Sequence, residues 1–107
     1  MTEAIVTSSV SVWVGDHGDL SLEELALACG ADLDWIAELV DMGVLSPEGA
    51  GRSAWRFGAS DLGRARKLLR LIRDFEVNLE AAAVILDLLE ETERLRARLR
   101  RAGVPVD

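Results

Sequence analysis

Two short helical segments joined by a tight turn constrain the fold of this chain more than any other feature. The stretch Ser21-Leu22-Glu23-Glu24 is a capping box, in which a serine and a glutamate side chain satisfy two free amides of the first helical turn. Gly30 ends that helix. Asp32 then caps a second helix, Leu33 to Met42, which stops at Gly43. Two short helices this close together predict a helix-turn-helix.

Apolar spacing predicts which parts of this region are buried. On the second helix, the residues at helical spacing form the expected buried stripe, which consists of Leu33, Ile36, Ala37 and Val40. Upstream, the segment from Ile5 to Val14 is rich in β-branched residues and partly alternates apolar with polar ones. This pattern predicts one half-buried strand, followed by a turn over residues 15–19.

The segment after the second helix has the pattern of a wing. Val44-Leu45 and Trp55-Arg56-Phe57 are predicted to be short strands, and they flank a loop marked by glycine and proline, Ser46 to Ser53. We expect Trp55 to lie in the core at the base of this wing and Arg56 to point outward. A third helix begins at Ser60, and its expected apolar face consists of Leu62, Ala65, Leu68, Leu69, Ile72 and Phe75.

Asn78 caps a fourth helix that runs to about Arg101, with Gly103 and Pro105 beyond it. One apolar stripe consists of Leu79, Ala82, Leu86 and Leu89. A second stripe alternates steps of four and three, as a heptad seam does, and consists of Ala81, Ile85, Leu88, Thr92, Leu95, Leu99 and Ala102. Because its second half extends beyond a small globule, Ile85, Leu88, Leu95 and Leu99 are the candidate seam of a homodimer. The alternative is a solvated tail held by pairs such as Glu90 with Arg94.

The charges are divided sharply along the chain. Ten carboxylates precede Arg52, and all twelve Lys and Arg residues lie from Arg52 to Arg101; the net charge is −7. A helix-turn-helix that meets DNA needs Lys or Arg on its surface. This one has acidic residues there, so direct DNA binding is not expected and a basic protein surface is the better partner.

The candidate partner-binding residues gather on and near the second helix. Asp34, Glu38 and Asp41 step by four and three and therefore share one face. Trp35 lies outside the predicted apolar stripe, so it is either an exposed interface anchor or half-buried against the wing. The full candidate set is Glu24, Asp32, Asp34, Trp35, Glu38 and Asp41. The alternative is a solvated acidic face.

The third helix is basic, because it carries Arg64, Arg66, Lys67, Arg70 and Arg73. These cations either contact a nucleic-acid backbone or an acidic partner, or balance the acidic half of the same chain. We favour intramolecular balance or a solvated basic face over a contact with a partner.

The sequence contains no motif that predicts an enzyme active site or a metal site. Cys29 is the single cysteine and His17 the single histidine, so neither a disulfide nor a structural zinc site is expected. Cys29 is expected to be a buried, inert thiol. No nucleophile–base motif or phosphate-binding loop is present, so we expect no enzyme activity and no cofactor. Without a signal peptide or a membrane-spanning run, a cytoplasmic protein is expected.

Several motifs together resemble the chaperone modulator CbpM family, which has the layout of the MerR superfamily's N-terminal domain. The matching stretches, in order, are Leu20 to Leu25, Ala28 to Gly30, Leu39 to Leu45, Trp55 to Phe57, Arg70 to Asp74 with Val77 to Leu79, and Leu86 to Leu89 with Glu93 to Arg96. The glycine-rich loop Gly49-Ala50-Gly51 departs from the family pattern.

The resemblance implies a protein that is not an enzyme. CbpM-like proteins bind the J-domain of CbpA, a DnaJ-type co-chaperone, and inhibit both its action with DnaK and its binding to DNA. We therefore expect one mostly α (α+β) winged helix-turn-helix domain over residues 1–107, with a strand and turn (1–19), helix-turn-helix (20–43), wing (44–59) and two-helix part (60–102). A MerR-type transcription regulator is the alternative, and a structural dimerisation module is a third possibility.

Overall fold

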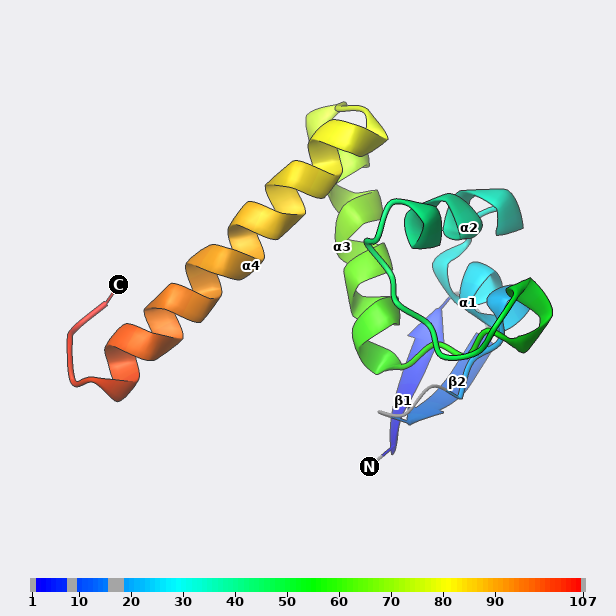
Figure 1. The fold of residues 1–107 in the computed structure, drawn as a ribbon, viewed down its shortest axis with the longest axis horizontal. Helices are drawn as coiled ribbons and strands as arrows, with labels where there is room; N and C mark the ends of the chain where they lie inside the picture. Colours follow the sequence, from blue (N-terminus) through cyan, green and yellow to red (C-terminus); the bar gives the residue numbers. More distant parts are fainter. Residues whose placement is uncertain (1, 8–9, 16–18, 107) are drawn as a thin grey trace. The chain divides into compact units, whose positions relative to one another are not determined.

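The computed structural model describes residues 2–7, 10–15 and 19–106, with side chains from Asp19 to Val106 (Figure 1). The described part is mostly helical, with helices α1 to α4 in chain order, and this confirms the predicted fold class. It divides into two compact units, residues 1–67 and 68–107, which are described separately below.

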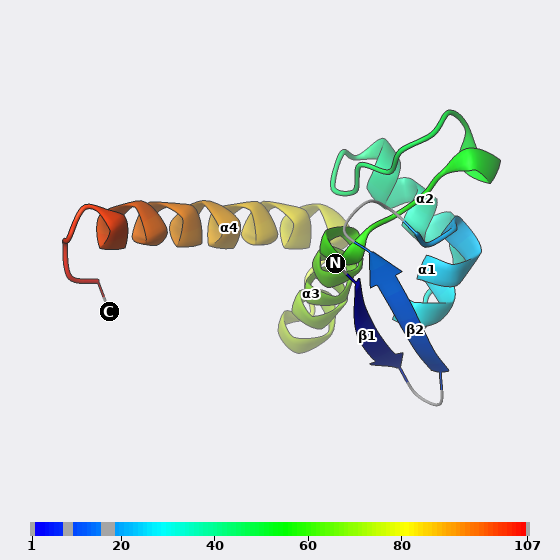
Figure 2. The ribbon, with the colours of Figure 1, turned by 90° about the horizontal axis from the view of Figure 1, so that it is seen from below.

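The N-terminal segment forms two strands where the sequence predicted one. β1 (Thr2–Thr7) and β2 (Val10–Gly15) pair antiparallel, with Thr2 opposite Gly15 and Thr7 opposite Val10 (Figure 2). The prediction of a single strand was therefore wrong: pairing satisfies backbone amides and carbonyls that a lone strand would leave open. The predicted burial of the strand's side chains lies outside the described residues, and so do residues 16–18 of the predicted turn over residues 15–19, His17 among them.

The capping prediction for α1 (Leu22–Cys29) is confirmed at both ends. The Ser21 hydroxyl accepts a hydrogen bond from the Glu24 amide at 3.1 Å, and Glu24 Oε1 accepts from the Ser21 amide at 2.8 Å. Gly30 ends the helix at φ 66°, where its amide donates to carbonyls of the last turn. Such a left-handed residue closes a helix at no steric cost only when it lacks a Cβ.

The second helix of the pair, α2 (Leu33–Asp41), packs against α1 but buries a different stripe from the one expected. Ile36 and Ala37 are buried as predicted, whereas Leu33 is 44% exposed and Leu39 is fully buried. Leu33 is the first residue of α2, where the helix is exposed. The Leu39 carbonyl accepts hydrogen bonds from both the Val44 and the Leu45 amides, which brings the following chain back to the end of α2.

Two details at the ends of α2 also differ from the sequence prediction. The Asp32 side chain makes no capping hydrogen bond, although Asp32 occupies the N-cap position. The helix is one residue shorter than expected, with Met42 as its C-cap and Gly43 following at φ 80°.

The wing is built from single bridges and a turn of 3-10 helix. Phe57 exchanges two backbone hydrogen bonds with Leu20, at 3.0 and 2.7 Å, and Glu48 does the same with Arg56. The 3-10 helix η1 (Arg52–Ala54) occupies the tip of the loop. The predicted strand at Val44-Leu45 is wrong, because the partner of Phe57 is Leu20, ahead of α1.

A small apolar core holds the first unit together. Phe57 is fully buried at its centre, and the half-buried Trp55 ring meets it edge-on at 6.1 Å between centroids. Arg56 is exposed, as expected. The other large side chains of this unit that are fully buried are Leu20, Leu25, Ile36, Leu39, Leu45 and Leu62.

Helix α3 (Ala59–Phe75) begins in the first unit and continues into the second. Asp61 Oδ2 accepts from the Gly58 amide at 3.1 Å and so satisfies a free donor at the helix start. Leu62, Ala65 and Leu68 are buried as predicted, but Phe75 is 67% exposed, so its place in the apolar face is wrong.

Helix α4 (Leu79–Arg101) makes up most of the second unit. Asn78 Oδ1 accepts from the Ala81 amide at 2.8 Å, which confirms the predicted cap. Ala82 and Leu86 of the first apolar stripe are buried, whereas Leu89 is exposed. Over the described residues, no helix combines the length and apolar character needed to cross a membrane.

Candidate functional site

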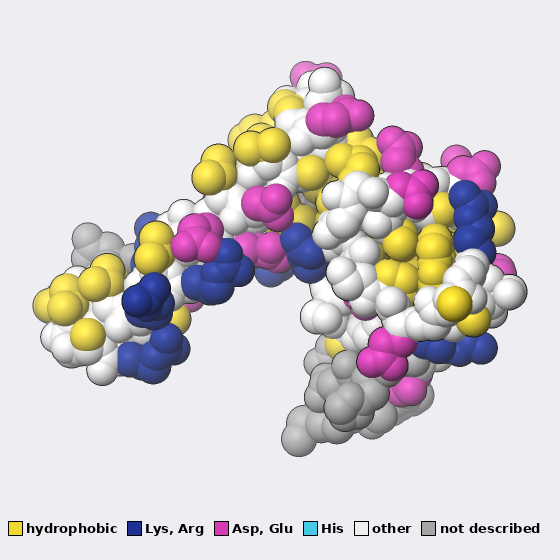
Figure 3. Space-filling view, viewed as in Figure 1, with side chains coloured by type: hydrophobic (Ala, Val, Ile, Leu, Met, Phe, Trp, Pro, Cys, Tyr) yellow, Lys and Arg dark blue, Asp and Glu magenta, His cyan; other side chains and the backbone are white. Residues whose placement is uncertain are grey.

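The exposed side of α2 carries three carboxylates in one narrow arc. Asp34, Glu38 and Asp41 are all exposed. At about 100° per residue, they fall within about 60° of one another around the helix axis. Figure 3 shows carboxylate side chains gathered over this part of the molecule, beside a patch of Lys or Arg.

The other two acidic residues of the predicted set do not lie on this arc. Glu24 belongs to α1, and one of its carboxylate oxygens is already engaged by the Ser21 amide in the capping box. Asp32 precedes α2 and is exposed at the N-cap position. The structure thus brings Asp34, Trp35, Glu38 and Asp41 together on α2 and leaves Glu24 and Asp32 apart.

An apolar edge borders the acidic arc. Trp35 is half-buried and Met42 is 38% exposed. Viewed down the helix axis, Met42 and Trp35 lie next to Glu38, at rotations of no more than about 60° from it. Sequence reasoning missed Met42, although its spacing of four from Glu38 and seven from Trp35 would have placed it on this side.

A cation from the wing already contacts the acidic arc. Arg52 Nη1 lies 3.5 Å from Asp34 Oδ1, and both side chains are largely exposed. Asp34 therefore receives a compensating charge, which the sequence could not reveal because the two residues are far apart along the chain. An exposed pair of this kind is worth only about 0–1 kcal/mol.

The C-terminal end of α2 is strongly negative. Its last residue is Asp41, and no basic residue lies in its last turn. The free carbonyls of a helix C-terminus carry about half a negative charge, so an aspartate there adds to an unfavourable potential. A cation supplied by another molecule would relieve it.

Two arginines of α3 are directed at backbone carbonyls within the first unit. Arg64 donates to the Val44 carbonyl, and Arg66 donates to the Ala28 carbonyl in the last turn of α1 at 3.4 Å. Lys67 and Arg70 are exposed, and Arg73 pairs with the adjacent Asp74 at 3.1 Å. The contacts of Arg64 and Arg66 favour an intramolecular role for these two cations.

Cys29 is a half-buried thiol. Burial raises its pKa to about 11, and the nearby charge of Arg66 opposes this shift. The thiol is therefore neutral at physiological pH and a poor nucleophile. Within the described ranges, no cluster of three His, Cys, Asp or Glu side chains is placed to hold a metal ion.

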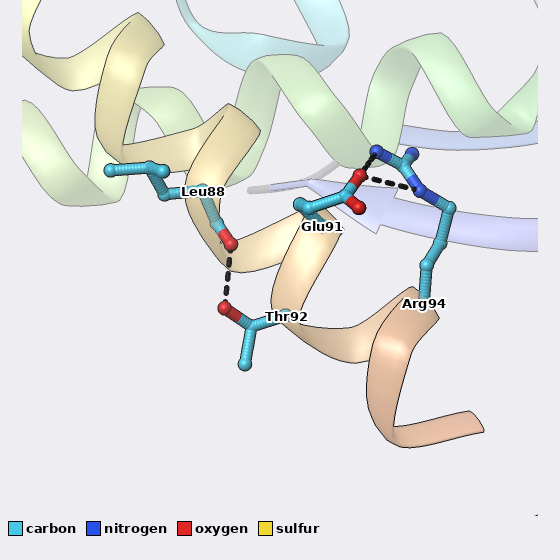
Figure 4. Close-up of polar contacts among 4 residues, drawn as sticks. All are labelled: Leu88, Glu91, Thr92 and Arg94. Carbon is cyan, nitrogen blue, oxygen red and sulfur yellow. Dashed lines mark hydrogen bonds and ion pairs between the residues drawn. The ribbon is translucent and has the colours of Figure 1, made fainter. Parts of the chain in front are cut away.

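The candidate dimer seam on α4 is largely uncovered. Leu88, Leu95 and Leu99 are exposed, and Ile85 is half-buried. Thr92 lies in the same stripe, and its hydroxyl donates to the Leu88 carbonyl at 2.8 Å, so this polar group needs no partner from another chain (Figure 4).

Charged side chains beside the seam are paired along the helix. Arg94 hydrogen-bonds Glu91 and points away from the side of Leu88 and Thr92 (Figure 4). Arg100 donates to Glu93 at 2.7 Å. The hydrogen bond to Glu91 raises the pKa of Arg94, and the charge of Glu90 adds to this effect.

The helix-turn-helix, the wing and the long helix after them define a winged helix-turn-helix protein of the MerR type. The family model of the MerR HTH family regulatory proteins matches residues 20–102. The chain is 36% identical over 100 residues to the chaperone modulatory protein CbpM of Coxiella burnetii (strain Dugway 5J108-111), covering 94% of this chain and 92% of that protein.

Other relatives bear the same name. The chaperone modulatory protein CbpM of Salmonella arizonae is 30% identical over 81 residues, which are 76% of this chain and 80% of that protein. The one from Pseudomonas entomophila (strain L48) is 28% identical over 78 residues, 73% of this chain and 77% of that protein. The chain therefore belongs to the CbpM family of chaperone modulatory proteins, which confirms the resemblance.

Proposed function

We propose that this chain is a cytoplasmic chaperone modulator that binds the J-domain of a CbpA/DnaJ-type co-chaperone. By binding, it inhibits both the stimulation of DnaK and the DNA binding of that co-chaperone. The relatives named chaperone modulatory protein support the general role. The observation that carries the J-domain proposal is the exposed arc Asp34, Glu38 and Asp41 on the helix that DNA-binding proteins of this fold insert into DNA.

The proposed mechanism is competition for one charged surface. J-domains present a basic helix to DnaK, and the acidic arc of α2 is complementary to it. Opposite charges speed the encounter and make binding sensitive to salt. While the J-domain helix lies on α2, it is masked from DnaK.

A DNA-binding regulator, the alternative function, is disfavoured by the same arc. α2 would present carboxylates to phosphates, which repels DNA. Arg64 and Arg66 of α3 are directed at carbonyls of their own chain.

The exposed seam on α4 supports a homodimer as the acting species. Carboxylates gather in the first half of this helix and arginines in its second half. Two copies that pair antiparallel place the arginine-rich end of one helix beside the carboxylates of the other. A parallel pair would instead place like charges together.

The proposed function is tested by reversing two charges of the arc, in the variant Asp34→Lys with Glu38→Lys. Each rim charge contributes about 0.2–1 kcal/mol, and reversal replaces attraction with repulsion. We expect the affinity for the cognate J-domain to fall by about tenfold or more, where tenfold corresponds to about 1.4 kcal/mol. The loss should shrink at high salt. Titration calorimetry measures it.

The control carries the same change of net charge elsewhere, in the variant Glu76→Lys with Glu80→Lys, since both residues are exposed in the second unit. Circular dichroism verifies that both variants remain folded. If the α2 variant is folded and binds as tightly as the wild type, the J-domain contact lies elsewhere.

A further inference from the structure

The exposed side of α2 consists of two parallel ridges with different chemistry. Asp34, Glu38 and Asp41 form the acidic ridge, and Trp35 and Met42 form an apolar ridge beside Glu38. Trp35, Glu38 and Met42 are spaced i, i+3 and i+7, so they form a strip along the helix about 10 Å long. That length matches about two turns of another helix lying against α2.

Arg52 indicates what kind of group this side of α2 accepts. Its guanidinium contacts Asp34, a member of the acidic ridge. In the part of the chain that the structure describes, the side chains of Glu38 and Asp41 have no ion-pair partner. The strip and Asp41 are therefore available to a cation from another molecule. They lie near Asp34, which Arg52 of the same chain already contacts.

We infer that the strip Trp35, Glu38 and Met42 docks a cationic amphipathic helix of the partner, an inference that rests on the proposed function. Apolar residues of the partner helix pack on Trp35 and Met42, while its Lys or Arg side chains pair with Glu38 and Asp41. A purely basic segment would leave the apolar ridge uncovered. A purely apolar helix would leave the carboxylates beside it without counter-charges.

The two ridges serve different steps of binding. The carboxylates attract the partner from a distance and set the association rate. Trp35 and Met42 make short-range contacts that are broken on dissociation, so they set the residence time. Met is suited to this position because its flexible thioether adapts to an irregular surface.

The test compares Met42→Gln with Leu33→Gln by surface plasmon resonance on the cognate J-domain. Both residues are exposed to a similar extent, 38% and 44%, on the same helix. Leu33 lies about 140° around the helix from Glu38, outside the strip. We expect Met42→Gln to dissociate on the order of tenfold faster, with the association rate nearly unchanged. Leu33→Gln should bind like the wild type.

A conservative variant and a map of the partner complete the experiment. Met42→Leu keeps an apolar side chain and should therefore retain the slow dissociation. If changes at position 42 acted by misfolding the protein, Met42→Leu would also dissociate faster. In NMR spectra of the labelled J-domain, the residues whose chemical shifts change on binding should lie on one face of a helix. That face should bear both Lys or Arg and apolar residues. Shifts confined to a non-helical segment would overturn the inference.

The outcomes separate the inference from the proposed function. If the wild type fails to bind the J-domain, the proposed function and the inference fall together. If the wild type binds and Met42→Gln binds with the same kinetics, the proposed function stands and the apolar strip is not its docking surface.

Discussion

Gly49 is the residue on which the close turn of the wing depends. Its φ is +106°, a conformation that side chains rarely adopt, and a Cβ placed there would lie 2.2 Å from the Ala54 carbonyl oxygen. The loop can therefore close on Ala54 only with glycine at this position. The same closure holds η1, which carries Arg52 toward Asp34.

The variant Gly49→Ala should therefore be less stable than the wild type by about 1–3 kcal/mol, because both the backbone conformation and the contact with Ala54 are strained. The midpoint of urea unfolding, followed by circular dichroism, measures this loss. Gly63→Ala is the matched control, since nothing lies within 4 Å of its Cβ position in α3. There, alanine should stabilise the protein by up to about 1 kcal/mol. Equal midpoints for Gly49→Ala and the wild type would contradict this account of the wing.

Single residues were predictable from the sequence where the interaction is local. The capping box of Ser21 and Glu24, the stop at Gly30 and the cap at Asn78 all involve residues within a few positions of each other. The contacts of Arg52 with Asp34 and of Arg66 with Ala28 join distant positions. No local pattern encodes them, so they became visible only in the structure.

Among the elements, helices were predicted better than strands. The apolar periodicity and the caps of a helix are local sequence signals. For this reason α1 to α4 lie within a residue or two of their predicted bounds. Strand pairing depends on a distant partner. Phe57 pairs with Leu20 rather than with Val44-Leu45, and the N-terminal segment forms two paired strands where the sequence predicted one.

The buried stripe of α2 shows a second limit of periodicity. The spacing of Leu33, Ile36 and Val40 predicted one side of the helix, but burial extends to Leu39, whose carbonyl binds the returning chain. The acidic residues of the candidate site were on the side left exposed. Their role as a binding site stays a prediction, which the charge-reversal variant tests.

The element that most needs a partner is α4, and its seam gives a sharp prediction. Replacing Leu95 and Leu99 with glutamate should convert a dimer into a monomer, because two exposed apolar contacts per copy become repelling charges. Sedimentation equilibrium at micromolar concentration measures the mass. Circular dichroism should remain unchanged, since neither side chain is buried.

The control for this experiment is Val104→Glu, which changes a comparably exposed apolar residue beyond the end of α4. It should leave the mass of the dimer intact. A wild type that sediments as a monomer at high micromolar concentration would show that the seam does not pair.

At the scale of the whole molecule, charge determines which large partners can approach. The net charge of −7 repels nucleic acid at long range. We therefore expect no sequence-specific binding to duplex DNA at physiological salt. Fluorescence anisotropy with promoter fragments from the neighbourhood of its own gene measures this. An isotherm with a nanomolar dissociation constant, in the range of specific DNA-binding proteins, would refute the expectation.

The bridge between Leu20 and Phe57 sets the order in which the first unit can fold. Its two hydrogen bonds join the entry of α1 to the end of the wing. Helices form from neighbouring residues within about a microsecond, whereas joining distant segments must first overcome the entropy of loop closure. α1 and α2 can therefore form early, and the bridge closes afterwards. Until the bridge forms, the wing is not held to the start of α1, so the contact of Arg52 with Asp34 is completed only after α2 has formed.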